Sequence, residues 1–83
     1  MIFEWDEKKN EINKSRHHIS FEDARYVFAD PFAVTRVDYN EEEPRWQIMG
    51  HIGTELLVLA VYAMRNRNGE EVIRIISARK ATS

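Results

Sequence analysis

Residues 55–79, ELLVLAVYAMRNRNGEEVIRIISAR, decide the fold. Two β-rich segments flank Asn68-Gly69, and an Asn-Gly pair between apolar runs is a strong signal for a two-residue hairpin turn. The first segment, Glu55 to Met64, is nearly all apolar, as expected for a central strand buried on both faces. The second segment runs from Val72 to Arg79. Together they predict a long antiparallel hairpin at the centre of a sheet.

The register of this hairpin brings two arginines together. With a two-residue turn, Arg65 lies opposite Val72 and Ala63 lies opposite Arg74, so the two arginines are diagonal neighbours on one face. A four-residue loop would shift the pairing by two residues and keep both on one face, whereas a three- or five-residue loop would separate them. Diagonal positions are roughly 7–8 Å apart at the backbone, which lets two guanidinium groups grip one phosphodiester. A competing interpretation pairs Arg74 with a carboxylate beside the turn or in the acidic first half of the chain.

The companion face of the hairpin is the more apolar one near the turn. It carries Val58, Ala60, Tyr62, Met64, Ile73, Ile75 and Ser77. We expect helices to cover this face and to leave the arginine face exposed. Strict alternation also assigns Arg79 to the helix-covered face, from which only the strand end or a β-bulge would release it.

The chain before the hairpin predicts two helices after a short strand, Ile2 to Trp5. Asp6 is a plausible N-cap for a charged helix through about Arg16. Ile12 is the only aliphatic residue of that helix, so we expect the helix to touch the core lightly through Ile12, flanked by Trp5 before it and Ile19 after it.

Ser20 opens the second helix, which ends at Asp30-Pro31 because the residue before proline is disfavoured in a helix. Its buried face consists of Phe21, Ala24, Val27 and Phe28.

Two further strands are predicted, Phe32 to Tyr39 and Arg45 to His51, with an acidic turn at Asn40 to Glu43. The element order is β-α-α-β-β-β-β. This order predicts an α+β fold with two N-terminal helices on one face of an antiparallel four-stranded sheet, plus the short N-terminal strand. No linker or repeat divides the 83 residues, so residues 1–83 form a single domain.

Composition excludes several kinds of protein. The chain has no cysteine, so a disulfide framework, a thiolate nucleophile and a Cys-ligated zinc site are all excluded. It shows no signal peptide and no membrane span, and we expect a cytoplasmic protein. The net charge of −2 hides a gradient: residues 1–44 hold six Lys/Arg against eleven Asp/Glu, whereas residues 45–83 hold six against three. The basic half is mostly arginine, which binds phosphate bidentately.

Histidine is the main candidate for acid–base chemistry. His17 and His18 are adjacent, so their side chains diverge on a helix, and without a third histidine nearby they predict no metal site. His17 can act as a general acid or base near neutral pH, while His18 suits a helix C-cap. Lys9, at the start of the first helix, suits either a phosphate contact or a solvated surface. No phosphate-binding glycine loop is present, and no cofactor is expected.

An ordered set of short motifs extends over nearly the whole chain. The set comprises Phe3-Glu4-Trp5-Asp6, Lys9, Asn13, His17, Ile19-Ser20-Phe21-Glu22, Ala24, Val27-Phe28-Ala29-Asp30, Arg45, Gly50, Tyr62, Arg65 and Ile73-Arg74-Ile75-Ile76-Ser77-Ala78-Arg79. With this spacing the chain resembles the BrnT toxins of bacterial type II toxin-antitoxin pairs, which have a RelE-like ribonuclease fold. The resemblance implies a metal-independent endoribonuclease that cleaves cellular RNA and is silenced by a BrnA-like ribbon-helix-helix antitoxin.

The resemblance also suggests roles for individual residues. Arg65 and Arg74 would stabilise charge on the phosphate, and His17 would act as acid or base. The candidates for RNA contact are Lys9, Arg45, Tyr62 and Arg79. DNA would be contacted only through the antitoxin, no membrane is involved, and the toxin would form a homodimer or a heterotetramer with its antitoxin.

The chain departs from the family in two places. It has Arg16-His17-His18 where the family usually has Lys-His-Gly. It also stops at Ala81-Thr82-Ser83, where family members normally continue into a basic C-terminal helix, so we expect that helix to be absent from a truncated or unusually short member. Two rival hypotheses follow: an inactive RelE-like binding module that serves as antitoxin partner and co-repressor, or a small dimerisation domain whose basic face meets the acidic half of another copy.

Overall fold

The computed structural model describes residues 1–39 and 43–81. Its elements are β1 (Ile2–Glu4), α1 (Glu7–His17), α2 (Phe21–Ala24), the 3-10 helix η1 (Arg25–Ala29), β2 (Val34–Asp38), β3 (Arg45–Ile52), β4 (Leu56–Arg67) and β5 (Glu70–Lys80). The predicted α+β class and element order are confirmed. The expected acidic turn includes residues 40–42, which lie outside the described residues. The expectation that a C-terminal helix is absent concerns residues 82–83, which also lie outside them.

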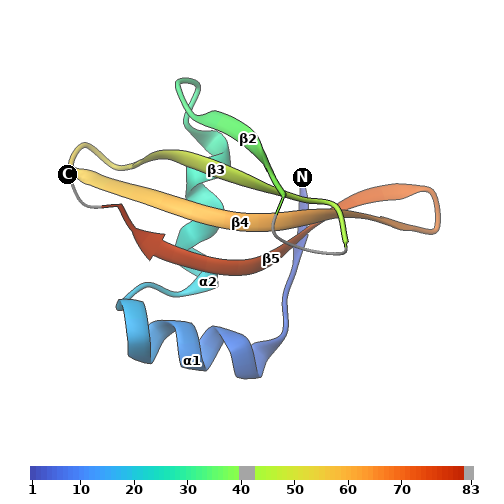
Figure 1. Cartoon of the computed structure of the whole chain (residues 1–83), viewed down its shortest axis with the longest axis horizontal. Coiled ribbons are helices and arrows are strands. Elements are labelled where there is room, and N and C mark those ends of the chain that lie inside the picture. The colour runs from blue at the N-terminus through green and yellow to red at the C-terminus, as the bar shows by residue number, and fades with distance from the viewer. Residues whose placement is uncertain (40–42, 82–83) are drawn as a thin grey trace.

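The strands form one five-stranded sheet in the order β1-β5-β4-β3-β2 (Figure 1). Strands β2 to β5 make the predicted antiparallel meander, but β1 runs parallel to β5. The sheet is therefore mixed rather than wholly antiparallel. The parallel pairing places Glu4 directly beside Arg74, a neighbour 70 residues later in the chain.

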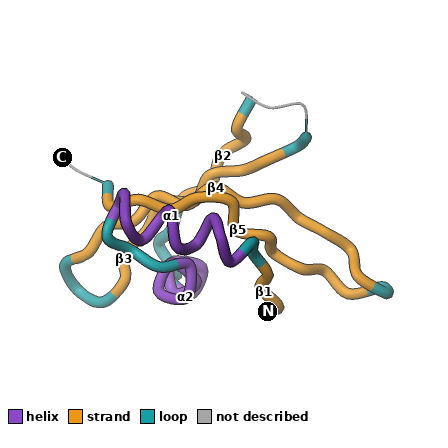
Figure 2. Tube along the Cα trace, turned by 90° about the horizontal axis from the view of Figure 1, so that it is seen from below, coloured by secondary structure: helices purple, strands orange, loops and turns teal. Residues whose placement is uncertain are grey.

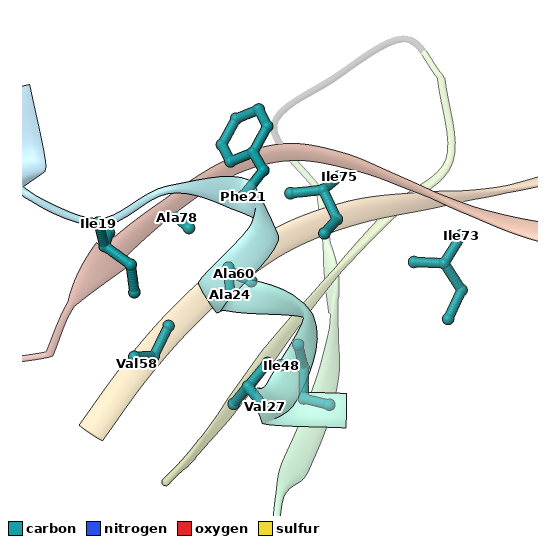
Figure 3. Packing of buried hydrophobic residues seen from close by; sticks show 10 residues of the cluster. All are labelled: Ile19, Phe21, Ala24, Val27, Ile48, Val58, Ala60, Ile73, Ile75 and Ala78. Atoms are coloured by element: carbon teal, nitrogen blue, oxygen red, sulfur yellow. The ribbon is translucent and has the colours of Figure 1, made fainter. Parts of the chain in front are cut away.

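Helices cover one side of this sheet, and α1 and α2 lie together there in Figure 2. The core between helices and sheet, drawn in Figure 3, consists of Ile19, Phe21, Ala24, Val27, Ile48, Val58, Ala60, Ile73, Ile75 and Ala78. Over the opposite side of the sheet, residues 1–39 and 43–81 place no helix. We call this side the outer face; its side chains include Arg36, Gln47, Arg65, Arg74 and Arg79.

Polar side chains, not Ile12, attach α1 to the rest of the molecule. Ile12 is 55% exposed, so the expectation that it anchors the helix is wrong. Asn10 and Asn13 are buried instead. The Asn13 amide donates to the Ala78 carbonyl at 2.7 Å and accepts from the Ala78 N–H at 3.2 Å, much as a neighbouring strand would. Helix α1 thus hydrogen-bonds to β5 beyond the point where β1 ends.

The hairpin between β4 and β5 has the predicted two-residue turn. Asn68 and Gly69 have φ values of 54° and 86°, the left-handed backbone that an Asn-Gly hairpin turn requires. Arg65 pairs with Val72 and Ala63 pairs with Arg74, which confirms the predicted register. The hairpin extends beyond the helices, as Figure 1 shows.

A β-bulge in β5 corrects the prediction for Arg79. Val61 pairs with Ser77 and Tyr62 with Ile75, which leaves Ile76 as an extra residue on β5. An extra residue reverses the in-out alternation of the strand after it. Ser77 and Arg79 therefore point to the outer face and not to the helix-covered face.

Helix boundaries follow the predicted caps. The Asp6 carboxylate accepts from the backbone N–H groups of Lys8 and Lys9, and the Ser20 hydroxyl accepts from that of Asp23. His18 closes α1 with φ of 61°, so a non-glycine residue adopts the left-handed C-cap here. Within the described residues, no helix is long and apolar enough to cross a membrane.

Candidate nucleic-acid interface

The turn end of the outer face carries a cluster of arginines around Glu4. Arg67 contacts both Glu4 oxygens, with Nε at 3.3 Å and Nη2 at 2.8 Å. Arg74 Nη1 donates to Glu4 Oε2 at 2.9 Å. One carboxylate therefore serves two guanidinium groups, and the cluster keeps a net positive charge. Arg74 uses one of its five N–H donors in this contact.

Two more outer-face arginines have acidic partners of their own. Arg65 Nη2 lies 2.9 Å from Glu43 Oε1, and Arg45 Nη2 lies 3.1 Å from Asp38 Oδ2. The Arg45–Asp38 pair is mostly shielded, with the Asp38 side chain only 3% exposed. Arg65 is more open, at 29% exposed. The competing interpretation, in which acids of the first half pair with the hairpin arginines, thus describes their state in the free protein.

The Glu4 carboxylate responds to this environment. Its burial favours the neutral acid, but hydrogen bonds and charge from Arg74 and Arg67 outweigh that effect and hold the pKa of Glu4 below its ordinary value. The carboxylate is therefore ionised at neutral pH. It fixes the guanidinium groups in place at the edge of the outer face.

His17 lies in a different part of the molecule, at the end of α1. A cleft of about 160 Å³ between α1 and β5 is lined by Lys9, Ile12, Asn13, Arg16, His17, Ile76 and Ser77. This cleft brings Lys9 and His17 together, which the sequence did not predict. It meets the outer face at Ser77, three residues after Arg74 and so roughly 10 Å farther along the strand. His17 is therefore not in the arginine cluster.

Tyr62 occupies the helix-covered side of the sheet. Its ring packs edge-on against Phe28 at 5.0 Å between centroids and stacks with Trp46 at 6.2 Å. Burial raises the pKa of the Tyr62 hydroxyl above its usual value. This placement separates Tyr62 from Arg65 and Arg74 and gives it a packing role. It does not fit the expected contact with RNA on the outer face.

Arg79 lies at the opposite end of the outer face from the turn. With Arg36 it borders a shallow hollow of about 370 Å³ over β2, β3, β4 and the end of β5. Arg36 was not among the sequence candidates, nor were Glu4, Arg67 and Arg16. Glu4 could not be found from sequence because only the parallel β1–β5 pairing brings it to Arg74. In residues 1–39 and 43–81, no three His, Asp or Glu side chains gather in a way that could hold a metal ion.

Comparison with known proteins identifies the family of the chain. A family described as "Ribonuclease toxin, BrnT, of type II toxin-antitoxin system" matches residues 5–83. The match defines the class first: ribonuclease toxins of type II systems, which act on RNA and have an antitoxin partner. Within that class, the chain belongs to the BrnT family.

A solved structure supports the same fold. The chain is similar to the crystal structure of the Brucella abortus ribonuclease toxin, BrnT, with a TM-score of 0.68 and 19% sequence identity over 100% of each chain. Among curated proteins, none matches the chain significantly.

Proposed function

We propose that this protein cleaves RNA without a metal ion, at the turn end of its outer face. The observation that carries the proposal is the register of the β4–β5 hairpin, which makes Arg65 and Arg74 diagonal neighbours on the outer face. In a chain of the BrnT family, two guanidinium groups at this spacing suit a phosphodiester.

The chemistry needs little from the protein beyond charge and proton transfer. A base takes the proton of the RNA 2′-hydroxyl, whose oxygen attacks phosphorus. An acid protonates the leaving 5′-oxygen as its bond to phosphorus breaks. Arg65 and Arg74 stabilise the negative charge that develops on the phosphate oxygens. We assign one of the proton transfers to His17, which RNA must reach across the β5 edge, and RNA contacts to Lys9, Arg45 and Arg79.

The ion pairs of the free protein are compatible with this role. Among residues 1–39 and 43–81, Arg74 and Arg65 have one ion pair each, at 2.9 Å, which leaves further N–H donors on each guanidinium group for phosphate. A carboxylate that already holds a guanidinium group reduces the side-chain entropy lost on binding. The turn end of the outer face is thus arranged before the RNA arrives.

The partner we propose is a BrnA-like ribbon-helix-helix antitoxin in the bacterial cytoplasm. It would bind the toxin in a heterotetramer and supply the only contact with DNA. We expect the antitoxin to cover the outer face, because covering its arginines would block RNA and silence the enzyme.

A second function has one observation in its favour. Arg45, Arg65, Arg67 and Arg74 each have a carboxylate partner in the free protein. A module that only binds an antitoxin would need no exposed arginine, and this pairing would then be purely structural.

Growth arrest and RNA cleavage, measured on the same protein, distinguish the two functions. Expression of the full chain without its antitoxin should arrest growth, and the purified protein should degrade RNA in the presence of EDTA. Arg74→Ala should lose both effects. Harmless expression, or degradation no faster than that of Arg74→Ala, would identify a binding module instead.

A further inference from the structure

The outer-face arginines divide into two groups. Those at the turn end have carboxylate partners, as described above. Arg36 and Arg79, at the other end, have no Asp or Glu within ion-pair distance among residues 1–39 and 43–81. An external anion can therefore meet their charges without displacing an acid of the described residues.

Both arginines border the same hollow, of about 370 Å³. Its lining residues are Val34, Thr35, Arg36, Gln47, Met49, Leu59, Arg79 and Ala81. Strand pairing places six of them in two rows across the sheet, in which Val61 and Ser77 complete the second row. One row is Val34, Met49, Leu59 and Arg79, and the next is Arg36, Gln47, Val61 and Ser77. The hollow thus has an apolar floor with one guanidinium group on each side.

The polar groups of the hollow are held in place. Arg36 Nε donates to Gln47 Oε1 at 2.8 Å, which positions the guanidinium group and leaves the Gln47 Nε2 group as the donor end of the amide. Arg79 reaches this side of the sheet only because of the bulge at Ile76. Neither a metal ion nor an extended apolar ligand suits such a site, because it offers cations around a small apolar surface.

A single nucleotide matches these features. A base can lie on Met49 and Leu59, its phosphate can pair with the guanidinium group on one side of the hollow, and Gln47 can donate to a base edge. The volume falls in the lower part of the range of about 300–1,000 Å³ typical of small-molecule sites. The hollow also shares its sheet face with Arg74, five residues before Arg79, or roughly 16 Å along the strand.

We infer that this hollow is a nucleotide subsite, which binds one base and its phosphate a few nucleotides from the cleaved bond and so contributes to the choice of RNA sequence. The inference rests on the proposed ribonuclease function for its biological meaning. Its physical content, a nucleotide bound between Arg36 and Arg79, does not depend on cleavage.

Binding is tested with mononucleotides. The full-length protein, labelled with ¹⁵N, is titrated with the four ribonucleoside 5′-monophosphates and with inorganic phosphate. We expect saturable shifts in the amides of Met49, Leu59 and Arg79, and at least one nucleotide should bind about tenfold or more tightly than phosphate, a difference of about 1.4 kcal/mol. Arg79→Gln should weaken that binding about tenfold. Lys80→Gln removes the same charge one residue later, beside Val58 on the helix-covered side, and should change nothing.

Cleavage kinetics give the second measurement. On a single-stranded RNA, Arg79→Gln should raise KM about tenfold and leave kcat within about twofold, whereas Arg74→Gln should lower kcat. If wild type binds nucleotides in the hollow but cleaves no RNA, the subsite stands and the proposed function fails.

Three other outcomes would overturn the subsite. If wild type cleaves RNA but Arg79→Gln leaves KM and nucleotide binding unchanged, the subsite is wrong. Equal affinity for phosphate and for all four nucleotides would also overturn it. Loss of antitoxin binding in Arg79→Gln, with RNA binding intact, would show that the hollow docks a protein instead.

Discussion

Asn13→Ala is expected to destabilise the protein more than Ile12→Ala, the same change at the neighbouring residue. The Asn13 amide makes three hydrogen bonds: to the Ala78 carbonyl at 2.7 Å, from the Ala78 N–H at 3.2 Å, and to the Ile19 carbonyl at 3.0 Å. Alanine removes all three and leaves backbone groups of two buried residues without their partner. Each such group costs about 1–3 kcal/mol when it stays dry.

Two effects reduce the total free-energy cost of Asn13→Ala. The cleft beside α1 borders Asn13, so water can reach part of the vacated space. Alanine also improves helix propensity by up to roughly 0.7 kcal/mol. The net loss in the free energy of unfolding should be about 2–4 kcal/mol. For a domain of this size, each kcal/mol lowers the melting temperature by about 4–8 °C.

Urea unfolding, followed by circular dichroism, measures the difference directly. Ile12→Ala is the matched control, since Ile12 is 55% exposed on the same helix and should cost less than about 1 kcal/mol. If Ile12→Ala proved the more damaging change, the attachment of α1 through its asparagines would be refuted.

Two further predictions concern the contact between β3 and residues 30–33, which follow η1. In Gly50→Ala, the added Cβ would lie 2.9 Å from both Ala33 Cβ and Asp30 Oδ2, so urea unfolding should show a loss of about 1–3 kcal/mol; an unchanged midpoint would contradict the close approach. The Asp30 carboxylate accepts from the backbone N–H groups of His51 and Phe32, which lowers the pKa of Asp30. A lowered pKa gives stability that is complete above the unfolded-state pKa of about 3.9 and is lost as pH falls through the folded-state value. Thermal unfolding between pH 7 and 2.5 should therefore show a smaller acid-dependent loss in Asp30→Asn than in wild type, and parallel curves would contradict this.

Local sequence signals predicted the hairpin well. The turn at Asn68-Gly69 and the pairing of Ala63 with Arg74 depend on residues close together in the chain, so turn chemistry alone sets the register. The caps at Asp6 and Ser20 are local in the same sense.

The features that sequence did not predict involve distant partners or an irregularity. The burial of Asn13 could not be predicted, because its partner Ala78 lies 65 residues away. The same holds for Glu4, which meets Arg74 only through a parallel strand pair. The bulge at Ile76 has no clear sequence signal, and it decides which face Arg79 occupies. Alternation identified the arginine hairpin but could not find the hollow that Arg79 borders.

The most direct test of the account is the cleavage rate of one defined single-stranded RNA at saturating concentration in EDTA. Arg74→Gln removes the guanidinium group on the outer face, and Arg25→Gln removes one from η1 on the helix-covered side of the sheet. Thermal unfolding first establishes that both variants are folded. We predict that Arg74→Gln lowers the rate about 100-fold or more, as expected for loss of a group that stabilises developing charge, while Arg25→Gln stays within about twofold of wild type. Equal rates for wild type and Arg74→Gln would contradict the assignment of RNA cleavage to the outer face.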